Sequence, residues 1–195
     1  MATTAHNILA RLAFTVTLFT AGHALAAEGD QMALVLHVDN YARIPPAQLA
    51  RAEAVVTAIY KDAGIQVTWI NDEANLALPL DEGARHLRVL LLCPKMTGAK
   101  ATSEQVAENV LGQAGPGGTR AYIFTYRVRN IALKHAQPFH AMLGHVMAHE
   151  IGHLLLPPHS HSETGIMREQ LNPWKLQADT FTLAQSEELR LALNR

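Results

Sequence analysis

The segment between Pro138 and Pro158 constrains the fold of this chain more than any other. Its apolar residues recur at intervals of three and four, which is the spacing of one buried face of an α-helix. A proline suits the first turn of a helix, and the residue before a proline avoids helical geometry. Pro138 can therefore start this helix, and the pair Pro157-Pro158 must end it. The apolar positions are Phe139, Met142, Leu143, Val146, Met147, Ile151, Leu154 and Leu155.

The same helix carries two histidines four residues apart, with a glutamate beside the first. On a helix, His149 and His153 lie on one face about one turn apart, so both imidazoles can reach one zinc ion at about 2.0–2.1 Å. Glu150 would not bind the metal, but it could accept a proton from water there. A histidine pair alone is more often a surface or hydrogen-bonded feature than a metal site, so the prediction depends on the residues downstream of His153.

Two further histidines, His159 and His161, lie beyond the end of the helix. A chain that breaks here can fold back and supply a third imidazole from either of them. The two prolines between the helix and these histidines provide the break. Seven of the eleven histidines lie between His135 and His161. Three of them are interpreted as ordinary surface or core residues, namely His135, His140 and His145.

The run from His149 to His159 resembles the zinc-binding motif of the metzincins, with three histidines and a glutamate at the same spacing. In an ungapped comparison with the matrixin subgroup, Met167 falls at the methionine of the tight turn beneath the zinc. One position departs: Leu156 stands where metzincins have a glycine, and a positive φ is unfavourable for leucine. The turn must therefore be made differently, for example by Pro157-Pro158. A group of secreted bacterial metzincin-like proteins has a similar string, and there the ligand aligns with His161.

This resemblance implies a zinc-dependent endopeptidase with an α/β (α+β zincin) fold. In that fold a mixed twisted sheet packs on two long helices, and a C-terminal helix comes last. Zinc would be held by His149, His153 and either His159 or His161, of which the metzincin spacing slightly favours His159, with Glu150 as general base. The substrate would be a protein or peptide. In metzincins it lies extended along an edge strand, for which residues 121–128 are the best candidate.

Two other functions fit parts of the pattern. A non-catalytic zinc-binding protein of the cell envelope would explain the many histidines, although zinc storage has no use for Glu150 beside the metal. A pseudo-enzyme that keeps the fold as an interaction module would explain Leu156 and the ambiguous third ligand. Loss of peptide cleavage on replacing Glu150, with zinc binding retained, would separate the peptidase from both.

The first half of the chain alternates strands with a helix. Residues 32–38 predict a strand, and Pro45-Pro46 opens a helix that Gly64 ends. Residues 65–70 alternate with period two, which predicts a second strand. Because the order is strand, helix, strand, the two strands are expected to pair in parallel.

After residue 70 the predicted strands and helices no longer alternate regularly. Residues 87–92 and 121–128 predict strands, whereas 71–86 and 112–118 predict a loop and an irregular connection. Thr182 with Gln185 predicts a capping box for a closing helix that runs through Leu193.

Length and composition limit the alternatives. A chain of 195 residues has room for one domain with a proper core. Hydrophobic residues make up 49% and charged residues 17%, and the formal net charge is −1. This balance is typical of a globular protein and gives no electrostatic reason to expect a nucleic acid as partner. The sequence does not predict an oligomeric state.

The amino-terminal residues predict export. Arg11 precedes an apolar run over residues 12–22, and Ala24-Leu25-Ala26 supplies the small residues that a signal peptidase recognises. We therefore expect a signal peptide at residues 1–26 and a single catalytic domain at 27–195, secreted or periplasmic. The run is shorter than the ~20 residues that a membrane-spanning helix needs, so no stable membrane insertion is expected after cleavage.

Overall fold

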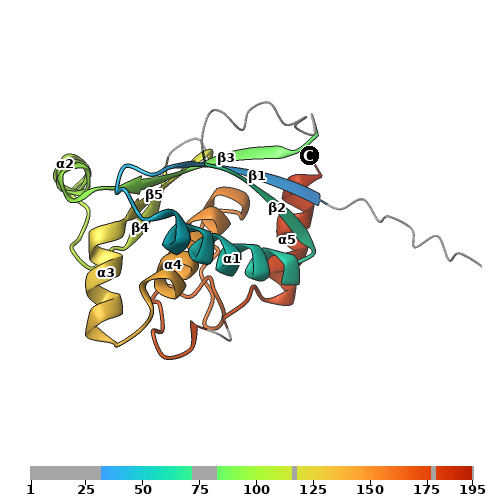
Figure 1. Cartoon of the computed structure of the whole chain (residues 1–195). Coiled ribbons are helices and arrows are strands. Elements are labelled where there is room, and N and C mark those ends of the chain that lie inside the picture. Colours follow the sequence, from blue (N-terminus) through green and yellow to red (C-terminus); the bar gives the residue numbers. More distant parts are fainter. Residues whose placement is uncertain (1–31, 72–82, 116–117, 177–178, 195) are drawn as a thin grey trace, which may run out of the picture.

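A computed structural model of the chain describes residues 32–71, 83–115, 118–176 and 179–194 (Figure 1). The predicted signal peptide at 1–26 lies outside the described residues, as does most of the predicted loop at 71–86. Within the described ranges, no helix combines the length and the apolar character that crossing a membrane requires.

The strands of the described residues form one sheet, and they are β1 Met32–Asp39, β2 Ile65–Ile70, β3 Arg85–Leu92, β4 Gly112–Ala114 and β5 Arg120–Phe124. Their order across the sheet is β2-β1-β3-β5-β4. The first four of these are mutually parallel, and β4 at the edge runs antiparallel to β5. The predicted parallel pairing of β1 with β2 is therefore confirmed, and so is the mixed sheet.

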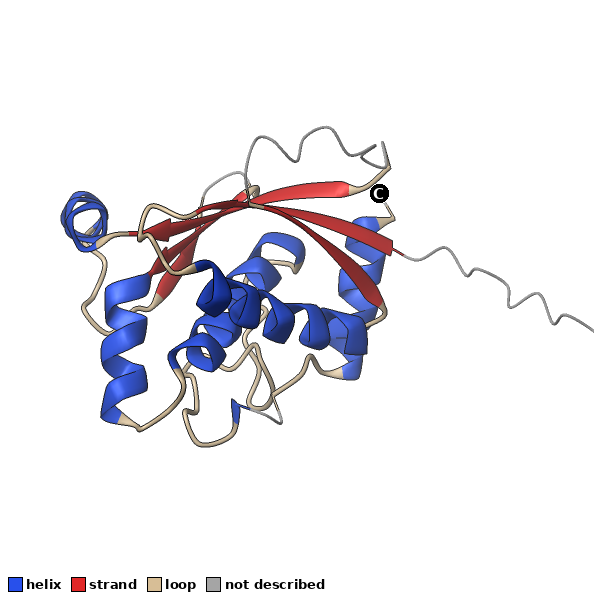
Figure 2. Cartoon of the chain, in the orientation of Figure 1, coloured by secondary structure: helices blue, strands red, loops and turns tan. Residues whose placement is uncertain are grey.

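The helices are α1 Pro46–Asp62, α2 Pro94–Glu104, α3 Thr125–Lys134, α4 Phe139–Leu155 and α5 Leu183–Leu193. The two longest, α1 and α4, pack against each other under one face of the curved sheet (Figure 2). The predicted α/β fold with two long helices and a C-terminal helix is thus confirmed. The capping box is also present, because the Thr182 hydroxyl accepts from the Gln185 N–H and the Gln185 side chain accepts from the Thr182 N–H.

Two predicted elements are wrong in part. The strand expected over 121–128 ends at Phe124, and α3 begins with Thr125, whose buried hydroxyl donates to the Leu92 carbonyl at 2.7 Å. The edge strand beside β5 is therefore β4, which lies in the stretch expected to be irregular. Its three residues are too few to show an alternating pattern. Helix α2 was not expected either, because Thr97 is its one buried residue and it lacks an apolar stripe.

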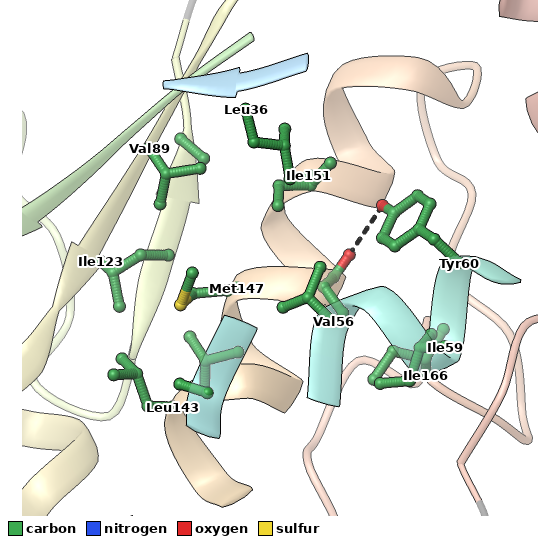
Figure 3. Packing of buried hydrophobic residues seen from close by; sticks show 14 of the residues in the cluster. Leu36, Val56, Ile59, Tyr60, Val89, Ile123, Leu143, Met147, Ile151 and Ile166 are labelled. Carbon is green, nitrogen blue, oxygen red and sulfur yellow. Dashed lines mark hydrogen bonds between the residues drawn. The ribbon is translucent and has the colours of Figure 1, made fainter. Parts of the chain in front are cut away.

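The core lies between the sheet and the pair of long helices, and Figure 3 shows its packing. Side chains from the sheet, from α1 and from α4 meet there. One polar contact crosses this core: the buried Tyr60 hydroxyl on α1 donates to the Ala148 carbonyl on α4 at 3.1 Å. Helix α4 is thereby fixed at the residue before His149. The labelled core residues are Leu36, Val89 and Ile123 on the sheet, Val56 and Ile59 on α1, Leu143, Met147 and Ile151 on α4, and Ile166 beyond it.

We predict that Tyr60→Phe lowers the free energy of unfolding by about 1–2 kcal/mol, because it removes a buried hydrogen bond without changing the ring packing. Urea denaturation measures the change. The matched control is Tyr41→Phe, since the Tyr41 side chain is half-exposed and its replacement should cost less than about 0.5 kcal/mol. Equally small effects of the two variants would show that the hydrogen bond from Tyr60 to Ala148 contributes nothing to stability.

Candidate metal centre

Three imidazoles converge at the carboxyl-terminal end of α4. The Nε2 atom of His153 lies 3.0 Å from Nε2 of His149 and 3.0 Å from Nε2 of His161. Within the described ranges this is the one group of three or more His, Cys, Asp or Glu side chains whose ligand atoms lie that close together, all within 4.8 Å. In a tetrahedral zinc site with bonds of 2.0–2.1 Å, the nitrogens are about 3.3 Å apart. The two distances from His153 are therefore within a few tenths of an ångström of those in a zinc site, and the group can bind zinc.

The tautomer of His149 fits a metal ligand. Its Nδ1 atom lies 2.8 Å from the Ile166 carbonyl, which can only accept a hydrogen bond. The proton of the neutral ring is therefore assigned to Nδ1, and the lone pair of Nε2 faces the other two rings. A hydrogen bond of this kind commonly fixes the orientation of a metal-binding histidine.

Burial keeps two of these rings in the neutral form that binds metals. Removal from water lowers the pKa of His149. It lowers the pKa of His153 to about 4, and the neighbouring rings of His149 and His161 contribute to that shift. Both rings are therefore unprotonated at neutral pH, as metal coordination requires.

The third imidazole comes from His161, and His159 is not part of the group. The spacing favoured His159, but the structure shows a later turn. Leu156, at the position of the metzincin glycine, is extended with φ −85° and ψ 158°, and the left-handed conformation falls on His159 at φ 62°. Because the chain reverses at His159, three residues after Leu156, the His159 side chain lies exposed at the turn and His161 returns to α4. In the sequence, Leu156 and the two prolines after it indicated that the turn would come later than in metzincins.

Glu150 lies between α4 and the edge strand. Its side chain is buried, and a Cβ atom on Gly112 would come within 2.5 Å of its Cγ, so β4 runs directly against the carboxyl group. Burial raises the pKa of Glu150 to about 8, although the hydrogen bond that it accepts from the Ala114 backbone lowers it in part. A carboxyl group of this pKa can exchange a proton near neutral pH.

Met167 forms the packing beneath the two helical histidines. It is fully buried, and a Cβ atom on Gly152 would meet its sulfur at 2.6 Å. The Phe181 ring lies beside the same glycine and makes an edge-to-face contact with Tyr60 at 5.0 Å between ring centres. Gly152, between His149 and His153, is thus required for the close approach of the Met167 segment to α4.

The remaining histidines of this region lie outside the metal group. The His145 ring is buried, with its nitrogens against the carbonyls of Ala141 and Leu176. His135 packs edge-on against the Trp174 ring at 5.5 Å between centres. Neither belongs to the group of three, as the sequence led us to expect, and His140 is also outside it.

No protein-family model and no curated protein matches the chain. Its fold is similar to that of a zinc-dependent peptidase from Methanocorpusculum labreanum, with a TM-score of 0.51 and 17% identity over 80% of this chain and 99% of the other. An archaemetzincin from Methanopyrus kandleri gives a TM-score of 0.46 and 17% identity over 88% of this chain and 100% of the other. The first of these structures shares the fold of this chain.

We predict that His161→Ala lowers zinc affinity by at least about 100-fold, because loss of a direct ligand costs more than loss of a residue that only supports one. Competition with a chromophoric chelator measures the dissociation constant. His159→Ala is the matched control and should change the constant by less than about threefold, as for other exposed side chains. The opposite ranking would assign the third ligand to His159.

Proposed function

We propose that this chain is a zinc-dependent endopeptidase of the metzincin type. The observation that carries the proposal is the convergence of His149, His153 and His161, with Glu150 buried on the same helix between the first two. The fold shared with a zinc-dependent peptidase supports it. So does the burial of Met167 against Gly152, which is where the metzincin comparison expects a methionine.

The residues divide the chemistry between them. The three imidazoles would hold a zinc ion, which when bound would supply the Lewis acidity that activates water and polarises a peptide carbonyl. Glu150 accepts the proton of the attacking water and passes it to the departing amine as the C–N bond breaks. No covalent bond to the protein is needed. The positive charge of a bound zinc ion would lower the pKa of Glu150 from the value to which burial raises it, and so would favour the ionised form that accepts a proton.

The edge strand β4 offers a place for an extended substrate. The Leu111 carbonyl accepts from Phe124 at 2.9 Å, and the Gly115 N–H donates to Arg120 at 2.7 Å. Because alternate residues of an antiparallel strand bond to its neighbour, Gly112 and Ala114 direct their backbone groups away from β5. Of these groups, the Ala114 N–H donates to the Glu150 carboxyl group. No described strand pairs with that side. A peptide added there would pass Glu150 without needing a free terminus, which favours cleavage within a chain.

Export completes the proposal and rests on sequence alone. The signal-like residues 1–26 and the single domain at 27–195 would place the peptidase in a periplasm or outside the cell. Peptides or unfolded proteins in that compartment would be its substrates.

We predict that Glu150→Gln lowers the rate of casein cleavage by at least about 100-fold while bound zinc stays at one equivalent, because the amide cannot accept the proton. Peptide release and metal content measure the two quantities. Glu108→Gln, at an exposed position, is the control and should change neither. Removal of zinc by a chelator should abolish cleavage in the wild type, and added zinc should restore it.

Two outcomes would contradict the proposal. Zinc-loaded wild-type protein that cleaves no unfolded protein or peptide would indicate a non-catalytic zinc-binding protein or a pseudo-enzyme. Cleavage that persists in the Glu150→Gln variant would assign the proton transfer to another group.

A further inference from the structure

Gln185, at the start of α5, connects that helix to the loop that carries His161. The side chain is buried, with 7% of its surface exposed. Its Oε1 atom accepts from the Thr182 backbone at 3.1 Å and so completes the capping box. Its Nε2 atom donates to the Ser160 carbonyl at 3.0 Å and to the Ser162 hydroxyl at 3.1 Å. One amide thus joins two segments that lie more than twenty residues apart in the sequence.

The orientation of this amide is determined by its partners. A backbone N–H can only donate, which places Oε1 at Thr182, and a carbonyl can only accept, which places Nε2 at Ser160. Both protons of the Nε2 group have an acceptor, so the side chain has no equally good alternative arrangement. A buried amide with these bonds satisfied is held rigidly.

The two loop partners are the residues on either side of His161. The loop leaves α4 in an extended conformation, turns at His159 and makes few backbone hydrogen bonds of its own. The Ser162 N–H donates to the Met167 carbonyl at 2.9 Å, which holds the far side of His161. The Ser160 carbonyl, on the near side, has Gln185 as its donor. The other contact on this side is long, since the Ser160 hydroxyl lies 3.5 Å from Nδ1 of His153. Without the bond from Gln185, the near side of the third imidazole would depend on that contact and on the irregular backbone of the turn.

We propose that Gln185 is a positioning residue for the metal centre. It holds the His161 ring in the place where zinc needs it, and it links the affinity for zinc to the docking of the C-terminal helix. This inference rests on the metal site within the proposed function and not on peptide cleavage. Because such coupling is reciprocal, zinc also stabilises the amino-terminal turn of α5.

Zinc affinity of the Gln185→Met variant tests the inference, since methionine has a similar length and donates no hydrogen bond. Its zinc dissociation constant should rise roughly 10- to 100-fold, as for residues that orient metal ligands. With Co²⁺ in place of zinc, the intensity of the d–d absorption should fall, because a poorly placed third ring distorts the tetrahedral geometry.

Thr182→Ala is the matched control. It removes the hydroxyl that accepts from the Gln185 N–H but leaves both bonds from Gln185 to the loop. It should lower the melting temperature through the lost cap, while the zinc constant changes by less than about threefold. Equal losses of zinc affinity in Thr182→Ala and Gln185→Met would overturn the inference, as would unchanged affinity in Gln185→Met.

Hydrogen exchange of the wild-type protein tests the same coupling without a substitution. Zinc should slow exchange of the Gln185 and Ser186 amides more than that of the α2 amides, because α2 lies at the opposite end of the molecule from α5 (Figure 1). Equal slowing in both places would contradict the coupling. If the wild type binds no zinc at all, the metal site itself fails; if it binds zinc and Gln185→Met binds equally well, only this inference fails.

Discussion

The packing of α4 between the sheet and α1 is the constraint on which the rest of the structure depends. This helix buries most of its length, and the Tyr60 hydroxyl contacts it at Ala148, immediately before His149. A helix held so firmly presents His149 and His153 in a fixed relation, because their separation is a consequence of helical geometry alone. The buried position also removes these rings from water, which lowers their pKa and keeps them neutral.

The position of the third imidazole, that of His161, does not follow from helical geometry. This ring lies in an irregular loop, and its position is set by where the chain can reverse after the helix ends. The loop reaches the metal group because Leu156 and Pro157 extend the chain and His159 makes the left-handed turn. His149 donates to the Ile166 carbonyl, and Gln185 donates to the neighbours of His161. These bonds hold the helix, the loop and the closing helix around one point. The site therefore combines two histidines on a firmly packed helix with a third on a loop whose position depends on tertiary contacts.

How much of this could be predicted varies from one segment to another. The periodic apolar residues and the prolines predicted α4 and the facing histidine pair, and the order of strand, helix and strand predicted the parallel start of the sheet. Helix α2 and strand β4 were missed because neither has a repeating apolar pattern long enough to detect. The choice between His159 and His161 depended on which residue adopts a positive φ, and Leu156 with the two prolines after it only hinted at a later turn. Gln185 was expected as a helix cap, but its bonds to the loop arise from tertiary contact alone.

Zinc K-edge X-ray absorption of the wild-type protein loaded with one equivalent of zinc tests the central claim most directly, since it counts the imidazoles at the metal. We expect three imidazole rings and one further light atom at about 2.0–2.1 Å, with no sulfur. A shell of oxygen atoms with fewer than two imidazoles would contradict the claim, as would a sulfur ligand from Cys93, the single cysteine of the sequence.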